Sequence, residues 1–218
     1  MKKYKAILKK EWGNFKGSER GVFFIYGIIV FTWSFFPLYK EMGSGPIWWL
    51  FFSVIICGNF SNSVFVSERL NGSMEILLTS GFSRSTVFFG KIAFVLLMSM
   101  IIGILCFSLS MVWLSIAGRE QASIGIGIVY DAVLFCTGVL MNAAFGAWMS
   151  FRLQSPRIIP FMTIMVMGII VALFYGLSFA FGTPQWALGL ILALAAGVFG
   201  ALAKKEFDGE KIIQPIHL

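Results

Sequence analysis

Long apolar runs, separated by short polar or turn-forming segments, dominate the hydrophobic pattern of this chain. A helix needs roughly 20 apolar residues to cross the hydrocarbon core of a bilayer. Six runs approach or exceed that length, at 21–39, 46–66, 86–117, 123–150, 158–181 and 185–203. The third and fourth are longer than one crossing requires, so we expect them to tilt, kink or project from the membrane. The pattern predicts an all-α, polytopic membrane protein with six transmembrane helices.

The composition agrees with this prediction. Hydrophobic residues make up 58% of the 218 residues and charged residues only 12%, whereas a soluble domain is closer to half apolar and one quarter charged. So few charges cannot cover the surface of a soluble protein of this size. The cysteines Cys57, Cys106 and Cys136 lie in apolar runs without metal-ligand spacing. We interpret them as small core residues and infer no disulfide.

Small residues inside the runs indicate where helices pack closely, because they let two helix backbones approach in lipid. We expect such contacts at Gly138, Gly146, Gly168 and Gly176. For Asn142, in the fourth run, we expect a hydrogen bond between helices.

The basic residues predict the orientation of the chain, because Lys and Arg are concentrated in cytoplasmic loops. With a cytoplasmic N-terminus, all of the 17 basic residues except Lys40 and Arg119 lie on the inner side. We therefore expect a multi-pass protein of the cell inner (plasma) membrane with both termini in the cytoplasm. This topology explains the net charge of +7 without a nucleic-acid partner. The chain 1–218 is predicted to be one transmembrane domain.

Residues 1–20 are predicted to form an amphipathic helix in the membrane interface. Its lysines occupy one face, which is typical of a helix whose cations meet anionic headgroups. Glu11 falls near the centre of the other face, which is apolar. Either this carboxylate reaches water or a neighbouring lysine, or the face meets protein and Glu11 pairs with a cation on a partner or on another segment. The apolar face consists of Tyr4, Ile7, Leu8, Trp12 and Phe15.

The polar segment between the second and third runs is predicted to contain a short helix, 71–80. Asn71 or Ser73 can cap its start, and Glu75 lies in its first turn, where a negative charge suits the helix dipole. Gly81 can end this helix, and Ser83 can cap the start of the third span. The alternative is an ordinary interfacial loop. After the bundle 21–203, the tail 204–218 is too short for a further domain.

The same segment carries a spaced pattern of residues. An acid-base pair is followed by Gly, Ser, Glu, two leucines, Thr, a Ser-Arg pair and finally Gly-Lys. The residues are Glu68, Arg69, Gly72, Ser73, Glu75, Leu77, Leu78, Thr79, Ser83, Arg84, Gly90 and Lys91. This pattern resembles the permease family of type-2 ATP-binding-cassette transporters. Leu70 replaces the second acid of the family's opening cluster, and Ser80-Gly81 replaces its usual proline step.

The resemblance implies an export permease that pairs with a second, identical or related permease and with two separate ATPase subunits. Helix 1–20 would be its connecting helix and helix 71–80 its cytoplasmic coupling helix, both in contact with the ATPase. ATP and Mg²⁺ would bind the partner ATPase. The short chain is similar to the haem-exporter permease of cytochrome c maturation, and equally to exporters of small peptides, lipid-linked molecules or drugs.

The chain itself carries no phosphate-binding loop of the Gly-x-x-x-x-Gly-Lys-Ser/Thr type. Gly90-Lys91 is followed by Ile92 and lacks the earlier glycine. We expect no catalytic residue, bound cofactor or metal in this chain, and therefore no enzyme activity of its own. The alternatives to a permease are a non-transporting membrane anchor or signalling component, or a secondary transporter.

Asp131 is the one acid inside a predicted span. An intramembrane carboxylate is by default a candidate functional group. Asp131 either lies at the interface, hydrogen-bonded to Tyr130 or water, or faces a lumen between two permease halves, where it would contact a cationic substrate or the other subunit. Asn142 is the second candidate for such a lumen.

Overall fold

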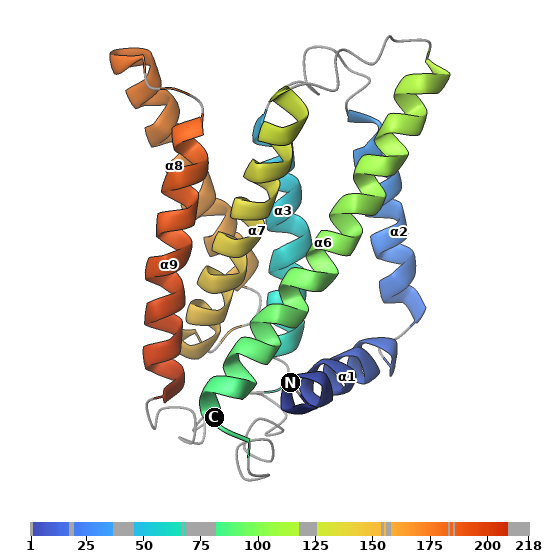
Figure 1. The fold of residues 1–218 in the computed structure, drawn as a ribbon, viewed down its shortest axis with the longest axis vertical. Helices are drawn as coiled ribbons and strands as arrows, with labels where there is room; N and C mark the ends of the chain where they lie inside the picture. The colour runs from blue at the N-terminus through green and yellow to red at the C-terminus, as the bar shows by residue number, and fades with distance from the viewer. Residues whose placement is uncertain are drawn as a thin grey trace.

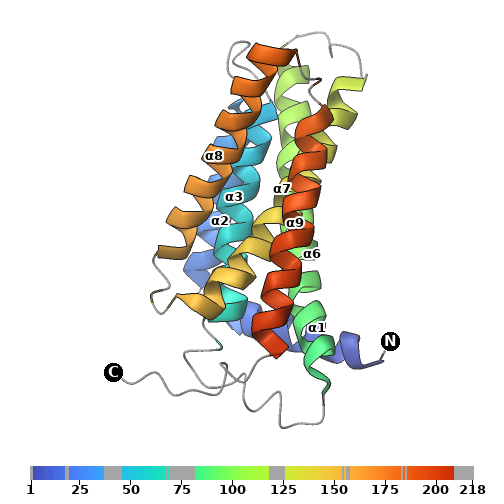
Figure 2. The same cartoon turned by 90° about the vertical axis from the view of Figure 1, so that its left-hand side faces the viewer.

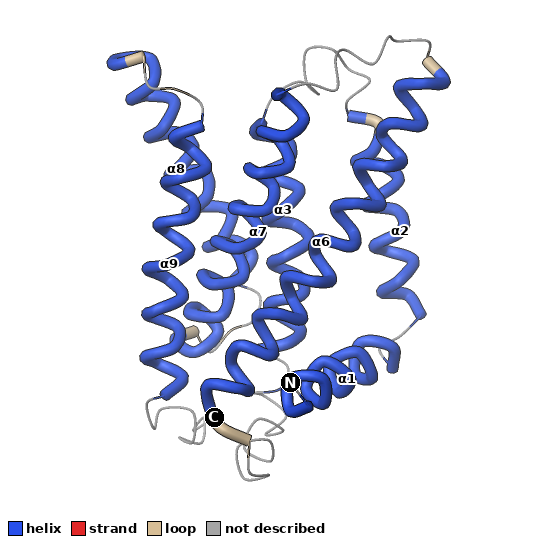
Figure 3. Tube along the Cα trace, viewed as in Figure 1, coloured by secondary structure: helices blue, strands red, loops and turns tan. Residues whose placement is uncertain are grey.

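The computed structural model describes residues 2–17, 20–36, 46–66, 68, 82–117, 126–153, 155, 158–182, 184 and 186–208. Within these ranges every regular element is a helix, and short loops lie between them, which confirms the predicted all-α class for the described part of the chain (Figure 3). The elements are α1 (Lys2–Gly17), α2 (Arg20–Ser34), α3 (Pro46–Ser61), the π-helical turn η2 (Asn62–Val66), α6 (Arg84–Ile116), α7 (Ile126–Arg152), α8 (Ile158–Phe181) and α9 (Trp186–Asp208).

Four helices are long and apolar enough to cross a membrane. They are α6, α7, α8 and α9, with spanning segments Arg84–Ile116, Val129–Arg152, Ile158–Phe181 and Trp186–Phe207. These helices correspond to the last four predicted spans. The first two predicted spans contain the shorter apolar stretches Phe24–Ser34 and Trp48–Gly58, so the count of six spans stays a prediction.

The start of α6 follows the expected capping chemistry. The Ser83 hydroxyl accepts a hydrogen bond from the backbone N–H of Thr86 at 3.2 Å. This bond satisfies one of the N–H groups that have no partner in the first turn of a helix.

Most helices run along the long axis of the molecule, whereas α1 lies across one end of the bundle, beside the start of α6 (Figures 1 and 2). This arrangement agrees with the sequence, because α1 alternates lysines with apolar residues while α2, α3 and α6–α9 are almost entirely apolar. A helix with many charges cannot cross the hydrocarbon core, so it is expected at the end of a bundle.

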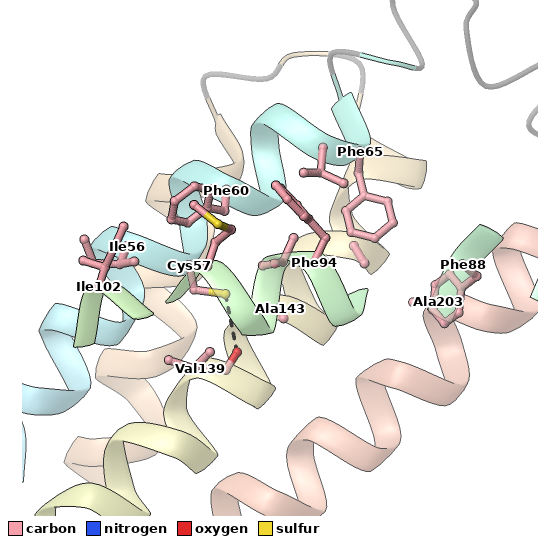
Figure 4. Close-up of a cluster of buried hydrophobic side chains, with 14 of the residues drawn as sticks. Ile56, Cys57, Phe60, Phe65, Phe88, Phe94, Ile102, Val139, Ala143 and Ala203 are labelled. Carbon is pink, nitrogen blue, oxygen red and sulfur yellow. Dashed lines mark hydrogen bonds between the residues drawn. The ribbon is translucent and has the colours of Figure 1, made fainter. Parts of the chain in front are cut away.

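The contact between α3 and α7 is built from small residues. A Cβ added at Gly146 would lie 2.6 Å from Ser61 Oγ, and one added at Gly138 would lie 2.7 Å from Ser53 Oγ. The Cys57 thiol donates to the Val139 carbonyl at 3.4 Å (Figure 4). The two helices therefore approach closely along three successive turns, as expected for Gly138 and Gly146.

The corresponding expectation for two glycines of α8 is wrong within the described residues. A Cβ added at Gly168 or Gly176 would meet nothing within 4 Å, because α8 turns much of its apolar surface outward. The expectation of a core position is also wrong for Cys136, which is exposed, whereas Cys57 and Cys106 are buried.

Candidate functional site

The inner surface of α1 is a single stripe of residues one helical turn apart. Ile7 is fully buried and Glu11 is only 3% exposed. The Phe15 ring packs on Tyr26 of α2 and Phe60 of α3, with ring centroids 6.3 and 5.5 Å away. Residues four positions apart lie on the same face of a helix, so this stripe attaches α1 to the bundle.

The remaining residues of the predicted apolar face form a second stripe beside the first. Tyr4 and Trp12 are 41% and 49% exposed, and Leu8 between them is partly buried against the core. The predicted single apolar face is thus divided in two, because α1 rests on α6 along only one of its sides.

A glycine lets α1 approach α6 closely. A Cβ added at Gly90 would lie 3.0 Å from Cγ2 of Ile7. The next residue of α6, Lys91, is completely buried and extends towards the same stripe of α1. The Gly90-Lys91 pair therefore provides both the space and the charge that hold α1.

Lys91 uses its ammonium group to join three segments. Its Nζ donates to Glu11 Oε1 of α1 at 3.0 Å, to the Val64 carbonyl of η2 at 3.0 Å and to Glu68 Oε2 at 2.5 Å. An ammonium has three N–H donors, so every donor has an acceptor. A buried charge is tolerated only when it is paired and hydrogen-bonded in this way.

Glu68 extends the cluster to a second lysine of the chain. Its Oε1 accepts from Lys10 Nζ at 2.5 Å and from Asn14 Nδ2 at 3.4 Å, both on α1. Lys10, Glu11, Glu68 and Lys91 together form what we term the buried ion cluster, which carries no net charge. Of the two interpretations of Glu11, the structure contains the one in which it pairs with a cation on another segment.

The two carboxylates of the cluster have opposite pKa shifts. Burial raises the pKa of Glu11, and the attraction of Lys91 does not fully offset this effect. Burial acts on Glu68 in the same direction, but the ammonium groups of Lys91 and Lys10 together hold the pKa of Glu68 below its ordinary value. Glu68 is therefore the more firmly ionised of the two.

Next to the cluster, where Lys91 lies over the Phe65 ring, aromatic rings join the ends of four helical segments. Phe65 of η2 contacts Phe88 of α6 and Phe151 of α7, and both of these contact Phe207 of α9. At the same end, the Arg152 guanidinium binds Glu206 of α9 at 2.8 Å. This end of the bundle is therefore closed by apolar packing around the ion cluster.

Lys91 is the functional candidate whose partners the sequence did not reveal. In the sequence Lys91 is one of the predicted inner basic residues and the last residue of the family pattern, with no partner assigned. The sequence feature that could have indicated this role is that Lys91 is the one charged residue of α6 after Arg84. An ionisable group inside an apolar helix requires a counter-charge, but the segment that provides it is known only from the fold.

The other sequence candidates lie elsewhere or outside the described residues. Asn142 is completely buried and donates to Ser53 Oγ at 3.0 Å, so it makes the expected helix–helix bond. Asp131 is half-buried near the end of α7 that is remote from α1. It precedes Asn142 by eleven residues, or roughly 16 Å along the helix. Outside the described residues lie helix 71–80 and Arg69, Gly72, Ser73, Glu75, Leu77 and Leu78.

The site consists of buried ionised side chains that are paired with one another. Among the described residues, no group of three or more His, Cys, Asp or Glu side chains is placed to hold a metal ion. The cluster joins α1, η2 and α6 through buried charges that are hydrogen-bonded to one another. No protein-family model, curated protein or solved structure matches this chain.

Proposed function

We propose that this chain is the membrane-spanning permease subunit of an ATP-driven exporter, with six spans and both termini in the cytoplasm. It would pair with a second permease and with two separate ATPase subunits, which bind ATP and Mg²⁺. The observation that carries the proposal is the buried ion cluster, in which the first and last residues of the family pattern, Glu68 and Lys91, form an ion pair at 2.5 Å.

The cluster suits a segment that transmits force. Residues 69–83, which we term the connecting segment and which are distinct from the connecting helix 1–20, link Glu68 to the start of α6. The ion pair between Glu68 and Lys91 joins the two sides of this segment. The same lysine binds Glu11 of α1. A push on the connecting segment would therefore reach α1, η2 and α6 together. α6 has 33 residues, or about 50 Å of helix, long enough to carry the movement across a bilayer.

The charge distribution supports a cytoplasmic position for this end. One end of the bundle holds α1, the start of α6 and the end of α9 (Figure 1). Their basic residues are the lysines of α1, Arg84, Lys204 and Lys205. Basic residues favour the cytoplasmic side. An ATPase in the cytoplasm would thus meet the same end as the connecting segment.

The first test is to purify the tagged full-length chain from its own membranes in mild detergent and to identify co-purifying proteins by mass spectrometry. We expect a stoichiometric ATP-binding-cassette ATPase. Glu75→Ala, and Leu77→Pro, which would break the predicted helix 71–80, should lower the coupling of ATP hydrolysis to transport while the chain still inserts into the membrane.

Glu206→Ala is the matched control, because it removes a carboxylate at the same end of the bundle but outside the connecting segment. Coupling at the unmodified level in both segment variants would remove the coupling role of 71–80. The absence of any such ATPase, in detergent and again in lipid nanodiscs, would favour a membrane anchor or a secondary transporter.

A further inference from the structure

The outer side of α1 presents lysines that have no acidic partner in the described part of the chain. Lys5, Lys9 and Lys16 are all exposed. The carboxylates of Glu11, Glu68 and Glu206 at this end of the bundle are bound to other cations: Glu11 and Glu68 to Lys91, and Glu206 to Arg152. The exposed positive charge of α1 therefore suits an anionic partner.

Two exposed aromatic side chains lie beside these lysines. Tyr4 and Trp12 belong to the second stripe of α1, next to the stripe that holds the helix on α6 and α2. Since α1 lies across the bundle where the long helices end (Figures 1 and 2), this second stripe is at the depth of the membrane interface. Tyr and Trp are enriched at that depth, and lysines extend from it towards headgroups.

We propose that the outer side of α1 is a binding surface for anionic phospholipid headgroups, with Lys5 and Lys9 on the phosphates and Trp12 among the upper acyl chains. Charge complementarity indicates this partner, because the surface places cationic lysines beside an exposed apolar side chain and a phospholipid offers an anionic headgroup beside apolar acyl chains. A protein partner would need acidic groups opposite these lysines and an apolar surface over Trp12. The inference does not depend on an ATPase and goes beyond the transport function.

The test uses the full-length chain in nanodiscs made of phosphatidylglycerol and phosphatidylcholine, with bromine on the acyl chains of only one of them. Bromine quenches nearby tryptophan, and the difference between the unmodified chain and Trp12→Phe isolates the emission of Trp12. At equal mole fractions, brominated phosphatidylglycerol should quench Trp12 more strongly. Each lysine that holds a headgroup should enrich the anionic lipid locally by about fivefold, and high salt should reduce the preference.

The double variant Lys5→Gln/Lys9→Gln should abolish the preference. Its matched control, Lys204→Gln/Lys205→Gln, removes the same charge at the same end of the bundle and should retain it. Equal quenching by the two brominated lipids, or an equal loss in the control, would overturn the proposal. Absence of quenching by either lipid would also overturn it, because Trp12 would then lie outside the acyl chains. The transport proposal is tested separately, by the co-purified ATPase.

Discussion

At the scale of single residues, Lys91 decides how the end of this protein is held together. Its side chain is completely buried and each of its three donors has an acceptor. The cost of burying a charge is offset only while all members of such a cluster remain. Removing one member therefore costs more than the loss of its hydrogen bonds.

The first prediction concerns Lys91→Met, which keeps the length of the side chain and removes the charge. Glu11 and Glu68 would remain buried with a deficit of positive charge, so we expect a loss of about 3–5 kcal/mol in the free energy of unfolding. Thermal unfolding in detergent measures this loss. Lys204→Met, at an exposed lysine, should change the unfolding midpoint little. Similar midpoints for the two variants would contradict a structural role of the cluster.

The second prediction is a dependence of stability on pH with two limbs. Glu11 has a raised pKa in the folded protein, so its contribution to stability falls as the pH rises from about 4.5 through the raised value. Glu68 has a lowered pKa, so its contribution is present above about 4.5 and is lost as the pH falls through the lowered value. Stability should therefore be greatest on the acid side of neutrality.

Two glutamine variants separate the limbs of this profile in thermal unfolding experiments. Glu11→Gln should flatten the limb above about 4.5, whereas Glu68→Gln should lower stability at neutral pH and flatten the acid limb. Glu206→Gln is the control and should leave both limbs in place. The same effect from Glu11→Gln and Glu68→Gln would show that the two carboxylates are equivalent, against the opposite shifts of their pKa values.

At the scale of the helices, the α3–α7 contact depends on the absence of side-chain atoms at particular glycines. A Cβ at Gly146 would lie 2.6 Å from Oγ and 2.9 Å from Cβ of Ser61. The Ser61 hydroxyl can rotate, but its Cβ is fixed by the backbone of α3. The two helices would have to separate to admit one methyl group, and tightly packed interiors resist such movement.

The third prediction compares two Gly→Ala variants in helices that both lie in the bundle. Gly146→Ala should destabilise the protein by about 1–3 kcal/mol because of overpacking. Gly176→Ala, where a Cβ meets nothing within 4 Å, should be neutral or stabilise by up to about 1 kcal/mol through helix propensity. Unfolding midpoints in detergent distinguish the two. Adding Ser61→Gly to Gly146→Ala should recover part of the loss, and no recovery would place the strain elsewhere.

At the scale of the whole molecule, the bundle has two chemically different ends. One end holds α1, the buried ion cluster and the basic ends of α6 and α9 (Figure 1). The opposite end holds the start of α7 with Asp131. Such an asymmetry indicates one preferred orientation in the membrane, since basic residues are retained on the cytoplasmic side.

The fourth prediction tests this orientation together with the number of spans. In a background with the three natural cysteines replaced by alanine, Ser44→Cys and Gln121→Cys should react with a membrane-impermeant thiol reagent added outside intact cells. Ser83→Cys, which precedes α6 at the cluster end and is exposed, should react only after the cells are opened. Labelling of Ser83→Cys from outside would contradict the predicted cytoplasmic position of this end.

The sequence by itself determined the class of the protein and the approximate limits of its long helices. The apolar runs correspond to α6–α9, and the lysines between apolar residues correspond to α1, because hydrophobic length and helical periodicity are local properties of a chain. Capping at Ser83 was also predictable, since it depends on residues that are neighbours in the chain.

Only the tertiary structure decided which residues act together. Glu11 had two open interpretations in sequence and Lys91 had no assigned partner, yet they lie 3.0 Å apart although 80 positions separate them. The same holds for Gly168 and Gly176, whose small size suggested packing while the fold leaves space around them. A charge pair or a close contact depends on how helices distant in sequence cross, and that geometry results from packing the whole bundle rather than from any local pattern.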